Sequence, residues 1–405
     1  MRKDSLLRVS EDLSILSGKA GEHVALLRDR LFPITDFDLG ALEVFRLRRS
    51  LESGVRALNA DPGNGKRDRE PAPALAAVSR LVDTGLLEED RHAARQYQRL
   101  RGMFGSRLAS LSDVQPGDVV VYGVPYDLGV TGQAGTERGP DYLRFASATA
   151  FDYACDERHL GWWHPGRQAQ VLKGVPIRDI GDVDCAGTAR NGEAFDRVYK
   201  VQTKVLELGG FPMMIGGDHS TSLPVIAATA SRHPGLVVIQ LDAHSDLGAD
   251  RDMGDWRRNA SHGNFMSWIA EDANVARVVQ LGIRHLMADR PFQSDKVDIH
   301  AGLDWLARLD ALLDGLPDDS PYYVTFDVDV LDPTVIGQTG TPIPGGLSYR
   351  DAVRVLHAIG DRFDLVGCDI VELRADRSLL EGCTVSYLGF ELLASRDLRR
   401  QRLAG

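Results

Sequence analysis

Apolar positions along most of the chain follow one repeating pattern. From Val119 onward, short apolar runs of strand length alternate with stretches in which apolar residues recur at helical spacing. This alternation is typical of a parallel sheet wrapped by helices, because parallel strands need long crossover connections. It predicts a three-layer α/β/α fold with a mostly parallel sheet. The predicted strands are 119–124, 213–215, 236–241, 278–281, 322–326 and 365–371, and the predicted helices are 194–208, 222–231, 303–313, 349–359 and 388–399.

The first hundred residues show a different pattern. Residues 7–16 and 24–32 predict two strands around a turn at 17–21, and Asp36 then caps a predicted helix. A polar loop at 61–73 precedes a second helical face that ends at Gly85. We therefore expect a small α+β, winged-helix-like module over residues 1–90. An arginine-rich linker helix over 91–115 then leads into a catalytic domain over 116–405.

Composition narrows the class of protein. The chain has 405 residues, of which 43% are hydrophobic, and a formal net charge of −11. This acidity argues against a nucleic-acid partner and favours a basic substrate. The sequence has no apolar segment of signal-peptide or membrane-spanning length, so we expect a cytoplasmic protein without a membrane partner. Its four cysteines lack a CxxC spacing and are expected to be reduced.

Three segments rich in aspartate and histidine follow predicted strands: residues 216–219 (GGDH), 242–246 (DAHSD) and 327–329 (DVD). In open α/β sheets, ligands bind beyond the carboxyl ends of the strands. Four buried aspartates would repel one another and lose hydration, whereas two divalent ions would cancel their charge. Residues 242–246 and 327–329 are expected to be extended, so that their alternate acidic and histidine side chains lie on one side of the chain. The sequence thus predicts a two-metal hydrolase that acts on a cation.

The candidate metal ligands share two chemical types, imidazole and carboxylate, with no thiolate. This donor set favours Mn²⁺ over zinc and leaves Ni²⁺ and Co²⁺ open. Asp218 and Asp332 are expected to cap turns or to support the ligands instead. The six candidate ligands are His219, Asp242, His244, Asp246, Asp327 and Asp329.

The order and spacing of these segments resemble the ureohydrolase superfamily, which includes arginase, agmatinase and their guanidino-acid relatives. The supporting segments also include 123–129 (GVPYDLG), 138–140, 179–182, 340–342 and 345–347, and the resemblance covers roughly residues 119–400. It implies an arginase-like fold, two Mn²⁺ per subunit and a homo-oligomer, either a trimer or a hexamer. It also implies that Asp242 and Asp327 bridge the ions, with His219 and Asp246 on one and His244 and Asp329 on the other.

The resemblance further implies roles in catalysis. A water between two divalent ions loses its proton near neutral pH and can attack a guanidinium carbon. Asp246 would relay the proton, His262 would protonate the leaving nitrogen, and Glu372 would clamp the guanidinium. Taken alone, His262 is a surface loop histidine and Glu372 a strand-end ion-pair partner. The chain departs from the family pattern after Glu372, where Leu373 and Arg374 replace the usual Asn-Pro.

The substrate stays open. Gly248 and Arg258 stand near positions where arginases have polar residues for the amino-acid head, which argues against free arginine. The stretch 250–259, with Trp256, Arg257 and Arg258, would suit the carboxylate of a guanidino acid. We therefore expect an agmatinase or guanidino-acid ureohydrolase with a small guanidino substrate.

Two alternatives remain. Similarity of the amino-terminal module to leader-peptide-binding winged helices would make the protein a peptide arginase, which converts arginyl residues of a precursor peptide to ornithine. A catalytically inactive metal-binding regulatory protein would instead have lost a ligand or the shuttle histidine, and neither is missing.

Overall fold

The computed structural model describes the carboxyl-terminal part of the chain almost continuously. The described ranges are 102–106, 108–151, 161–185, 191–248, 254–286, 294–376 and 378–404, with shorter segments between residues 6 and 89. The chain divides into two compact units, Met1–Gln98 with Cys185–Asn191, and Arg99–Asp184 with Gly192–Gly405. No helix among the described residues is long and apolar enough to span a membrane.

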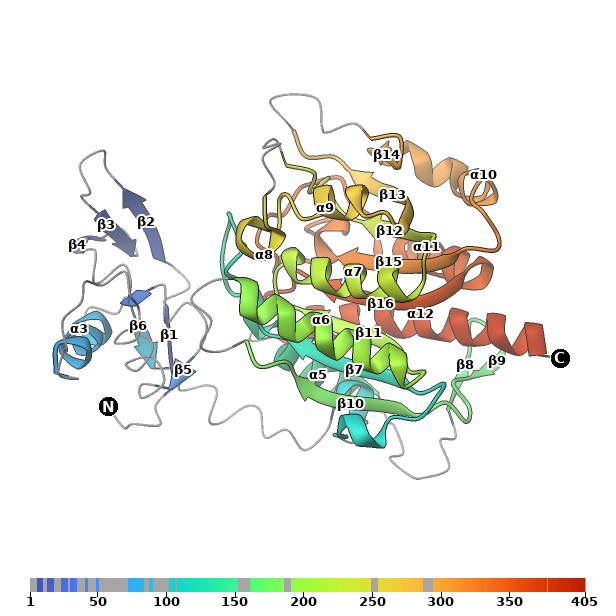
Figure 1. Ribbon diagram of the computed structural model, residues 1–405, viewed down its shortest axis with the longest axis horizontal. Helices are drawn as coiled ribbons and strands as arrows, with labels where there is room; N and C mark the ends of the chain where they lie inside the picture. The colour runs from blue at the N-terminus through green and yellow to red at the C-terminus, as the bar shows by residue number, and fades with distance from the viewer. Residues whose placement is uncertain are drawn as a thin grey trace. The chain divides into compact units, whose positions relative to one another are not determined.

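The amino-terminal unit contains two small antiparallel sheets and a helix (Figure 1). The predicted hairpin is present, since β2 pairs with β3 and Ser17 lies opposite His23. The prediction of one strand over 7–16 is wrong, because this segment forms two strands in different sheets. The prediction of one strand over 24–32 is also wrong, because this segment is divided between β3 and β4, which pair antiparallel. The sheets have the orders β5-β1-β6 and β2-β3-β4. The elements are β1 (Leu6–Val9), β2 (Leu13–Ser17), β3 (His23–Leu27), β4 (Arg30–Ile34), β5 (Arg49–Ser50), α3 (Ala72–Asp83) and β6 (Leu87–Glu89).

Several predictions for this region fall on residues that the structure does not describe. The helix after Asp36 is described only at Ala41 and Leu42, which are helical, and residues 61–71 of the predicted loop are outside the described part. The winged-helix-like assignment stays a prediction. In the described part of the predicted linker helix, the chain instead forms two 3-10 turns, η2 (Met103–Gly105) and η3 (Leu111–Asp113). Phe104 has a φ of 57°, which a continuous helix excludes.

The second unit is built on an eight-stranded sheet in which every described strand pair is parallel, as predicted. Its order is β10-β7-β11-β16-β15-β12-β13-β14. Strands β7, β11 and β12 are buried along their whole length, which explains their continuous apolar runs. The strands are β7 (Val119–Val124), β10 (Ile177–Asp182), β11 (Phe211–Gly216), β12 (Leu236–Leu241), β13 (Val275–Ile283), β14 (Val297–Ala301), β15 (Pro321–Asp327) and β16 (Asp364–Val371).

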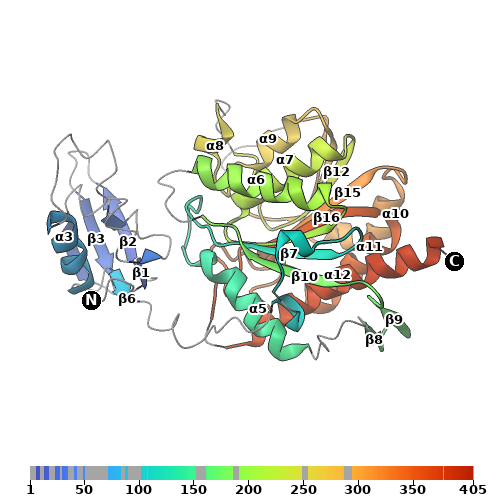
Figure 2. The ribbon, with the colours of Figure 1, turned by 60° about the horizontal axis from the view of Figure 1, so that its bottom comes forward.

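Helices cover both faces of this sheet and confirm the three-layer prediction. Figures 1 and 2 show α6, α7 and α9 on one face and α5, α11 and α12 on the other. A short hairpin of β8 and β9 lies next to α12 near the carboxyl terminus. These elements are α5 (Gly139–Ala150), β8 (Trp162–His164), β9 (Ala169–Val171), α6 (Asn191–Glu207), α7 (Ser222–Arg232), α8 (Trp256–Asn259), α9 (Met266–Glu271), α10 (Leu309–Asp314), α11 (Tyr349–Arg362) and α12 (Leu380–Ala404).

The sequence pattern missed elements that lack a clear period. Edge strand β10 alternates buried and partly exposed residues and contains two aspartates, so it has no apolar run. Helix α5 begins with Gly139 and Pro140, which on their own indicate a turn. The predicted helix at 303–313 is divided between η6 (Asp304–Arg308) and α10, and the helix predicted at 388–399 is the middle of the longer α12.

Candidate metal centre and active site

The four central strands of the sheet carry the acidic segments. Strands β11, β16, β15 and β12 are consecutive neighbours, and His219, Glu372, Asp327 and Asp242 lie at or just beyond their carboxyl ends. Gly217 permits a tight turn after β11, because a Cβ there would lie 1.7 Å from the carbonyl oxygen of Tyr126.

Asp218 and Asp332 cap turns, as predicted. The Asp218 carboxylate accepts a hydrogen bond from the backbone N–H of Ser220 at 2.9 Å and so starts η5 (His219–Thr221). The Asp332 carboxylate accepts hydrogen bonds from the backbone N–H groups of Thr334 at 3.0 Å and Gly345 at 2.8 Å.

Segments 242–246 and 327–329 form turns, so the prediction that they are extended is wrong. The Asp242 carboxylate accepts from the backbone N–H of His244 at 2.6 Å, and the Asp327 carboxylate accepts from that of Asp329 at 2.8 Å. An aspartate that bonds to the N–H two residues later folds the chain into a turn. Asp246 has a φ of 52°, in the left-handed region that a non-glycine residue rarely adopts. Strain of this kind concentrates at functional sites.

The first group of candidate ligands surrounds His219. Its Nδ1 lies 3.0 Å from Asp242 Oδ2, 3.1 Å from Asp246 Oδ2 and 3.1 Å from Asp327 Oδ2. Among the described residues, this buried nitrogen has no partner in hydrogen-bond geometry. One nitrogen that faces three carboxylate oxygens without bonding to any of them fits a cation between them.

The second group lies around His244. Its Nδ1 is 2.9 Å from Asp329 Oδ2 and 3.6 Å from Asp242 Oδ1. Asp242 therefore turns one oxygen toward each histidine, as a bridging ligand would. Asp327 Oδ2 belongs to the first group, while its Oδ1 accepts from the Asp329 N–H, so its second bridging contact stays a prediction. The structure brings all six predicted ligands together, and only His244 is more than a tenth exposed.

The protonation behaviour of the cluster shows how much negative charge it concentrates. Burial, followed by the charge of Asp242, raises the pKa of Asp246 to about 7. Burial and neighbouring carboxylates also raise the pKa of Asp327 and Asp329. Burial opposes the protonation of His244, but its contacts with Asp242 and Asp329 outweigh it and raise the pKa of His244 to about 12. Without metal ions, the cluster must take up protons to limit its charge, so these residues fit a pair of divalent cations.

Three residues behind His219 orient its ring and were not predicted from the sequence. The Thr325 hydroxyl donates its proton to Asp369 Oδ1 at 2.7 Å. Thr325 Oγ1 therefore accepts a hydrogen bond from His219 Nε2 at 2.8 Å. Tyr323 donates to the other Asp369 oxygen at 2.8 Å. The Nε2–H bond leaves the Nδ1 lone pair to face the carboxylates. A signal was available, because Tyr323, Thr325 and Asp327 alternate as polar positions on one side of β15.

Asp242 is oriented in a similar way by two buried glutamines. Gln240 Nε2 donates to Asp242 Oδ2 at 2.7 Å, and Gln280 Nε2 donates to Gln240 Oε1 and to the Ser245 carbonyl, both at 2.6 Å. Both glutamines are fully buried within strands β12 and β13. Buried amides in otherwise apolar strands are unusual and here support the ligand on the adjacent turn.

Glu372 and His262 meet beside the His219 group. Glu372 Oε1 accepts from the backbone N–H of His219 at 2.8 Å and lies 3.1 Å from His262 Nδ1. Its Oε2 is buried without a hydrogen-bond partner among the described residues, and the φ of Glu372 is 65°. Burial disfavours charge on His262, but the Glu372 carboxylate outweighs it and raises the pKa of His262 to about 9. His262 is therefore buried at the site, in contrast to an ordinary surface loop histidine.

Thr131 closes over the other side of His262. Its backbone N–H donates to His262 Nε2 at 2.8 Å, and its hydroxyl lies 2.7 Å from the same nitrogen. In this arrangement the His262 proton is on Nδ1, toward Glu372. The raised pKa of His262 favours a second proton on Nε2, and that proton requires the Thr131 N–H to move away.

Arg257 and Arg284, which lie near the candidate site in the sequence pattern, make structural contacts. Arg257 Nε donates to Asp196 at 2.7 Å, and its guanidinium lies over the Trp256 ring. Its charge is thus already paired, which weakens the expectation that this stretch meets a substrate carboxylate. Arg284 donates to the carbonyls of Asp329 at 2.6 Å and Ile343 at 2.7 Å and so joins the DxD turn to the 343–344 loop.

Comparisons with known proteins agree with this geometry. A model of the arginase family matches residues 117–383. The agmatinase of Neisseria gonorrhoeae is 31% identical over 286 residues, which cover 66% of this chain and 85% of that protein. The structure of a hypothetical agmatinase from Burkholderia thailandensis is similar, with a TM-score of 0.62 and 26% identity over 77% of this chain and 94% of that one. The structure of proclavaminate amidino hydrolase from Streptomyces clavuligerus is also similar, with a TM-score of 0.62 and 26% identity. The match covers 75% of this chain and 99% of that one. The chain belongs to the arginase family, whose ureohydrolases are hydrolytic enzymes acting on amidino carbon–nitrogen bonds.

Proposed function

We propose that this protein is a binuclear ureohydrolase of the agmatinase or guanidino-acid type, which cleaves a guanidino group to an amine and urea. The observation that carries the proposal is the pair of His/Asp groups that share Asp242. Next to them lies Glu372 Oε2, for which the described part of the chain offers no hydrogen-bond partner. Relatives named agmatinases support a small guanidino substrate.

The six ligands would hold two Mn²⁺ ions. His219, Asp246, Asp327 and one oxygen of Asp242 would bind the first ion. His244, Asp329 and the other oxygen of Asp242 would bind the second. When bound, such an ion pair supplies Lewis acidity and lowers the pKa of a water to near neutrality. Thr325 and Gln240 hold the ligands in orientation, so little reorganisation accompanies the reaction.

Glu372 and His262 would act on the substrate itself. The free, buried Oε2 of Glu372 suits an N–H of a planar guanidinium, and a carboxylate orients such a cation well. His262, held against Glu372, would give its proton to the departing amine nitrogen. General acid assistance of this kind is worth roughly 10²- to 10⁴-fold in rate.

Arg374 bears on the choice of substrate. It lies two residues after Glu372, and its guanidinium donates to Gln133, whose backbone approaches Gly340 beside Glu372 Oε2. Arg374 Nε is buried without a hydrogen-bond partner among the described residues. A positive charge next to this segment would repel the distal ammonium of agmatine and attract the carboxylate of a guanidino acid. This charge favours a guanidino acid such as 4-guanidinobutyrate.

The test is urea release from agmatine, 4-guanidinobutyrate, guanidine, arginine and an arginine-containing peptide, with Mn²⁺ supplied. We expect turnover of 4-guanidinobutyrate to exceed that of agmatine, and Arg374→Gln to narrow the difference. Arg257→Gln provides a matched loss of charge at an arginine that is paired with Asp196. Absence of urea from every guanidine would overturn the enzyme assignment.

A second candidate is a peptide arginase, favoured by the separate unit Met1–Gln98, which lies outside the family match at 117–383. In that case deletion of residues 1–90 abolishes peptide turnover and spares turnover of the small guanidine. Equal loss of both activities would count against a peptide-binding role.

A further inference from the structure

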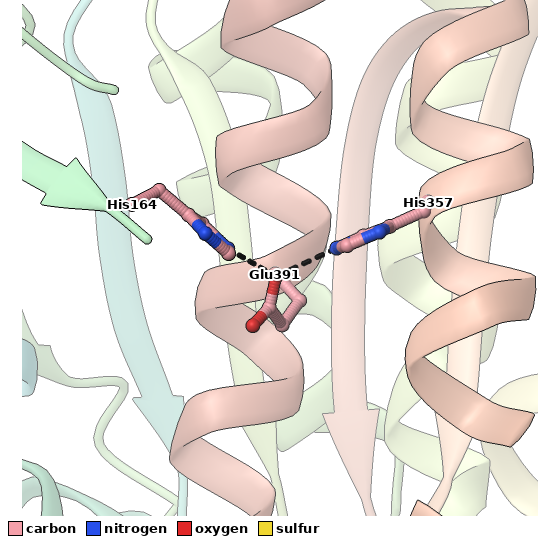
Figure 3. Close-up of side chains that lie close together, drawn as sticks. All are labelled: His164, His357 and Glu391. Atoms are coloured by element: carbon pink, nitrogen blue, oxygen red, sulfur yellow. Dashed lines mark hydrogen bonds and ion pairs between the residues drawn. The ribbon is translucent and has the colours of Figure 1, made fainter. Parts of the chain in front are cut away.

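A third group of possible metal ligands lies away from the strand ends, on the helical face of the second unit. His164 ends strand β8, His357 is in α11 and Glu391 is in α12. Figure 3 shows the two imidazoles pointing from opposite sides toward the Glu391 carboxylate. His164 Nε2 lies 2.8 Å from Glu391 Oε2, and His357 Nε2 lies 2.7 Å from the same oxygen.

The three ligand atoms are already nearly in place for one ion, since they all lie within 4.8 Å of one another. Two ligands on a tetrahedral zinc stand about 3.3 Å apart, so each nitrogen–oxygen separation would widen by only about 0.5 Å. The side chains are 12%, 21% and 12% exposed, which leaves access for the ion and for a water as a further ligand.

The surroundings do not compete for these ligands. The guanidinium of Arg167, three residues from His164, donates to both oxygens of Asp361 at 2.7 Å and is therefore paired elsewhere. Both histidines contact the same oxygen of Glu391, Oε2. The other oxygen, Oε1, can therefore also take part in metal binding.

Proton balance is simple at this group. Without an ion, each Nε2 carries the proton that bonds to Glu391, and His164 Nδ1 accepts from the Arg167 backbone N–H at 3.2 Å. Metal binding at Nε2 moves the imidazole proton to Nδ1. At His164, a proton on Nδ1 replaces the 3.2 Å hydrogen bond from the Arg167 N–H. The Arg167 N–H keeps its other hydrogen bond, to the His164 carbonyl at 3.2 Å.

We propose that His164, His357 and Glu391 bind one zinc ion, separate from the binuclear centre. Two imidazoles and one carboxylate suit zinc better than Mn²⁺, which prefers a more oxygen-rich set. The ion joins the β8–β9 hairpin to α11 and α12, which are distant in sequence, and so stabilises the folded chain. This group shares no residue with the acidic cluster, so the ion is separate from the proposed reaction centre.

The experiment counts divalent ions per chain in the full-length protein. The protein is first saturated with Mn²⁺, then dialysed against zinc buffered at micromolar free concentration, and total metal is measured by mass spectrometry. We expect three ions per wild-type chain and two in His357→Gln and Glu391→Gln. His300→Gln, which removes a partly exposed histidine outside the group, should retain three.

A second readout covers the case in which a variant fails to fold. Added zinc should raise the thermal midpoint of the wild-type protein and of His300→Gln, but not that of a folded His357→Gln. Two ions per wild-type chain would overturn the proposal whatever the variants do, because the three side chains then form only a hydrogen-bonded contact. Equal ion counts in the wild type and in a folded Glu391→Gln variant would overturn it as well.

Discussion

Replacement of Thr325 by valine tests whether the buried residues behind His219 determine metal binding. Valine has nearly the same shape but no hydroxyl, so the change removes the 2.8 Å contact with His219 Nε2 and the 2.7 Å bond to Asp369. Both His219 and Thr325 are essentially inaccessible to solvent, so no water replaces the lost oxygen.

The magnitude follows from these contacts. A buried N–H left without an acceptor costs about 1–3 kcal/mol in folding free energy. Loss of the partner that fixes a metal-binding imidazole lowers metal affinity by about 10- to 100-fold. We expect both effects in Thr325→Val, whereas Thr325→Ser keeps the hydroxyl and should stay close to the wild type.

The assay measures manganese bound per chain over a range of buffered free Mn²⁺ concentrations, together with the urea midpoint of unfolding. Thr229→Val is the matched control, because Thr229 is equally buried and its hydroxyl bonds Gln202 and the Val225 carbonyl, both at 2.8 Å, away from the cluster. It should lose stability without a change in metal affinity. If Thr325→Val binds Mn²⁺ within twofold of the wild type, or if both variants weaken binding equally, the orientation argument is refuted.

Three further predictions concern the same site. Asp329→Ala should leave one ion per chain and remove most activity, and retention of two ions would contradict the ligand assignment. His262→Asn should lower kcat by about 10²- to 10⁴-fold with the ion count unchanged, and an unaltered kcat would exclude a proton-donor role. In the ion-free protein, Asp246 has a pKa raised from 3.8 to about 7, so it takes up a proton on folding. Stability of chelator-treated protein should therefore fall as the pH rises from 5 to 7, and Mn²⁺ should reduce that fall; a urea midpoint that rises with pH would contradict this.

Local sequence patterns identified much of the second unit. The strands predicted at 119–124 and 236–241 have the observed bounds, because a strand buried on both faces must be continuously apolar. Edge strand β10 and helix α5 were missed because neither has such a run or a clear period. The candidate ligands were found from their spacing, since two or three such residues stand within a few positions of one another.

Tertiary structure decides the contacts between residues that are far apart in the sequence. Residue types and local spacing were sufficient to predict the acidic cluster, its excess of negative charge and the need for divalent ions to balance it. The strand order β11-β16-β15-β12, which does not follow the chain, brings His219, Glu372, Asp327 and Asp242 to one edge. The bonds of Thr325 to His219 and Asp369, and the meeting of His164 with His357 and Glu391, are likewise contacts across long sequence separations. No local pattern encodes them, because a period or a spacing reports only on neighbours along the chain, whereas packing decides which distant side chains share a site.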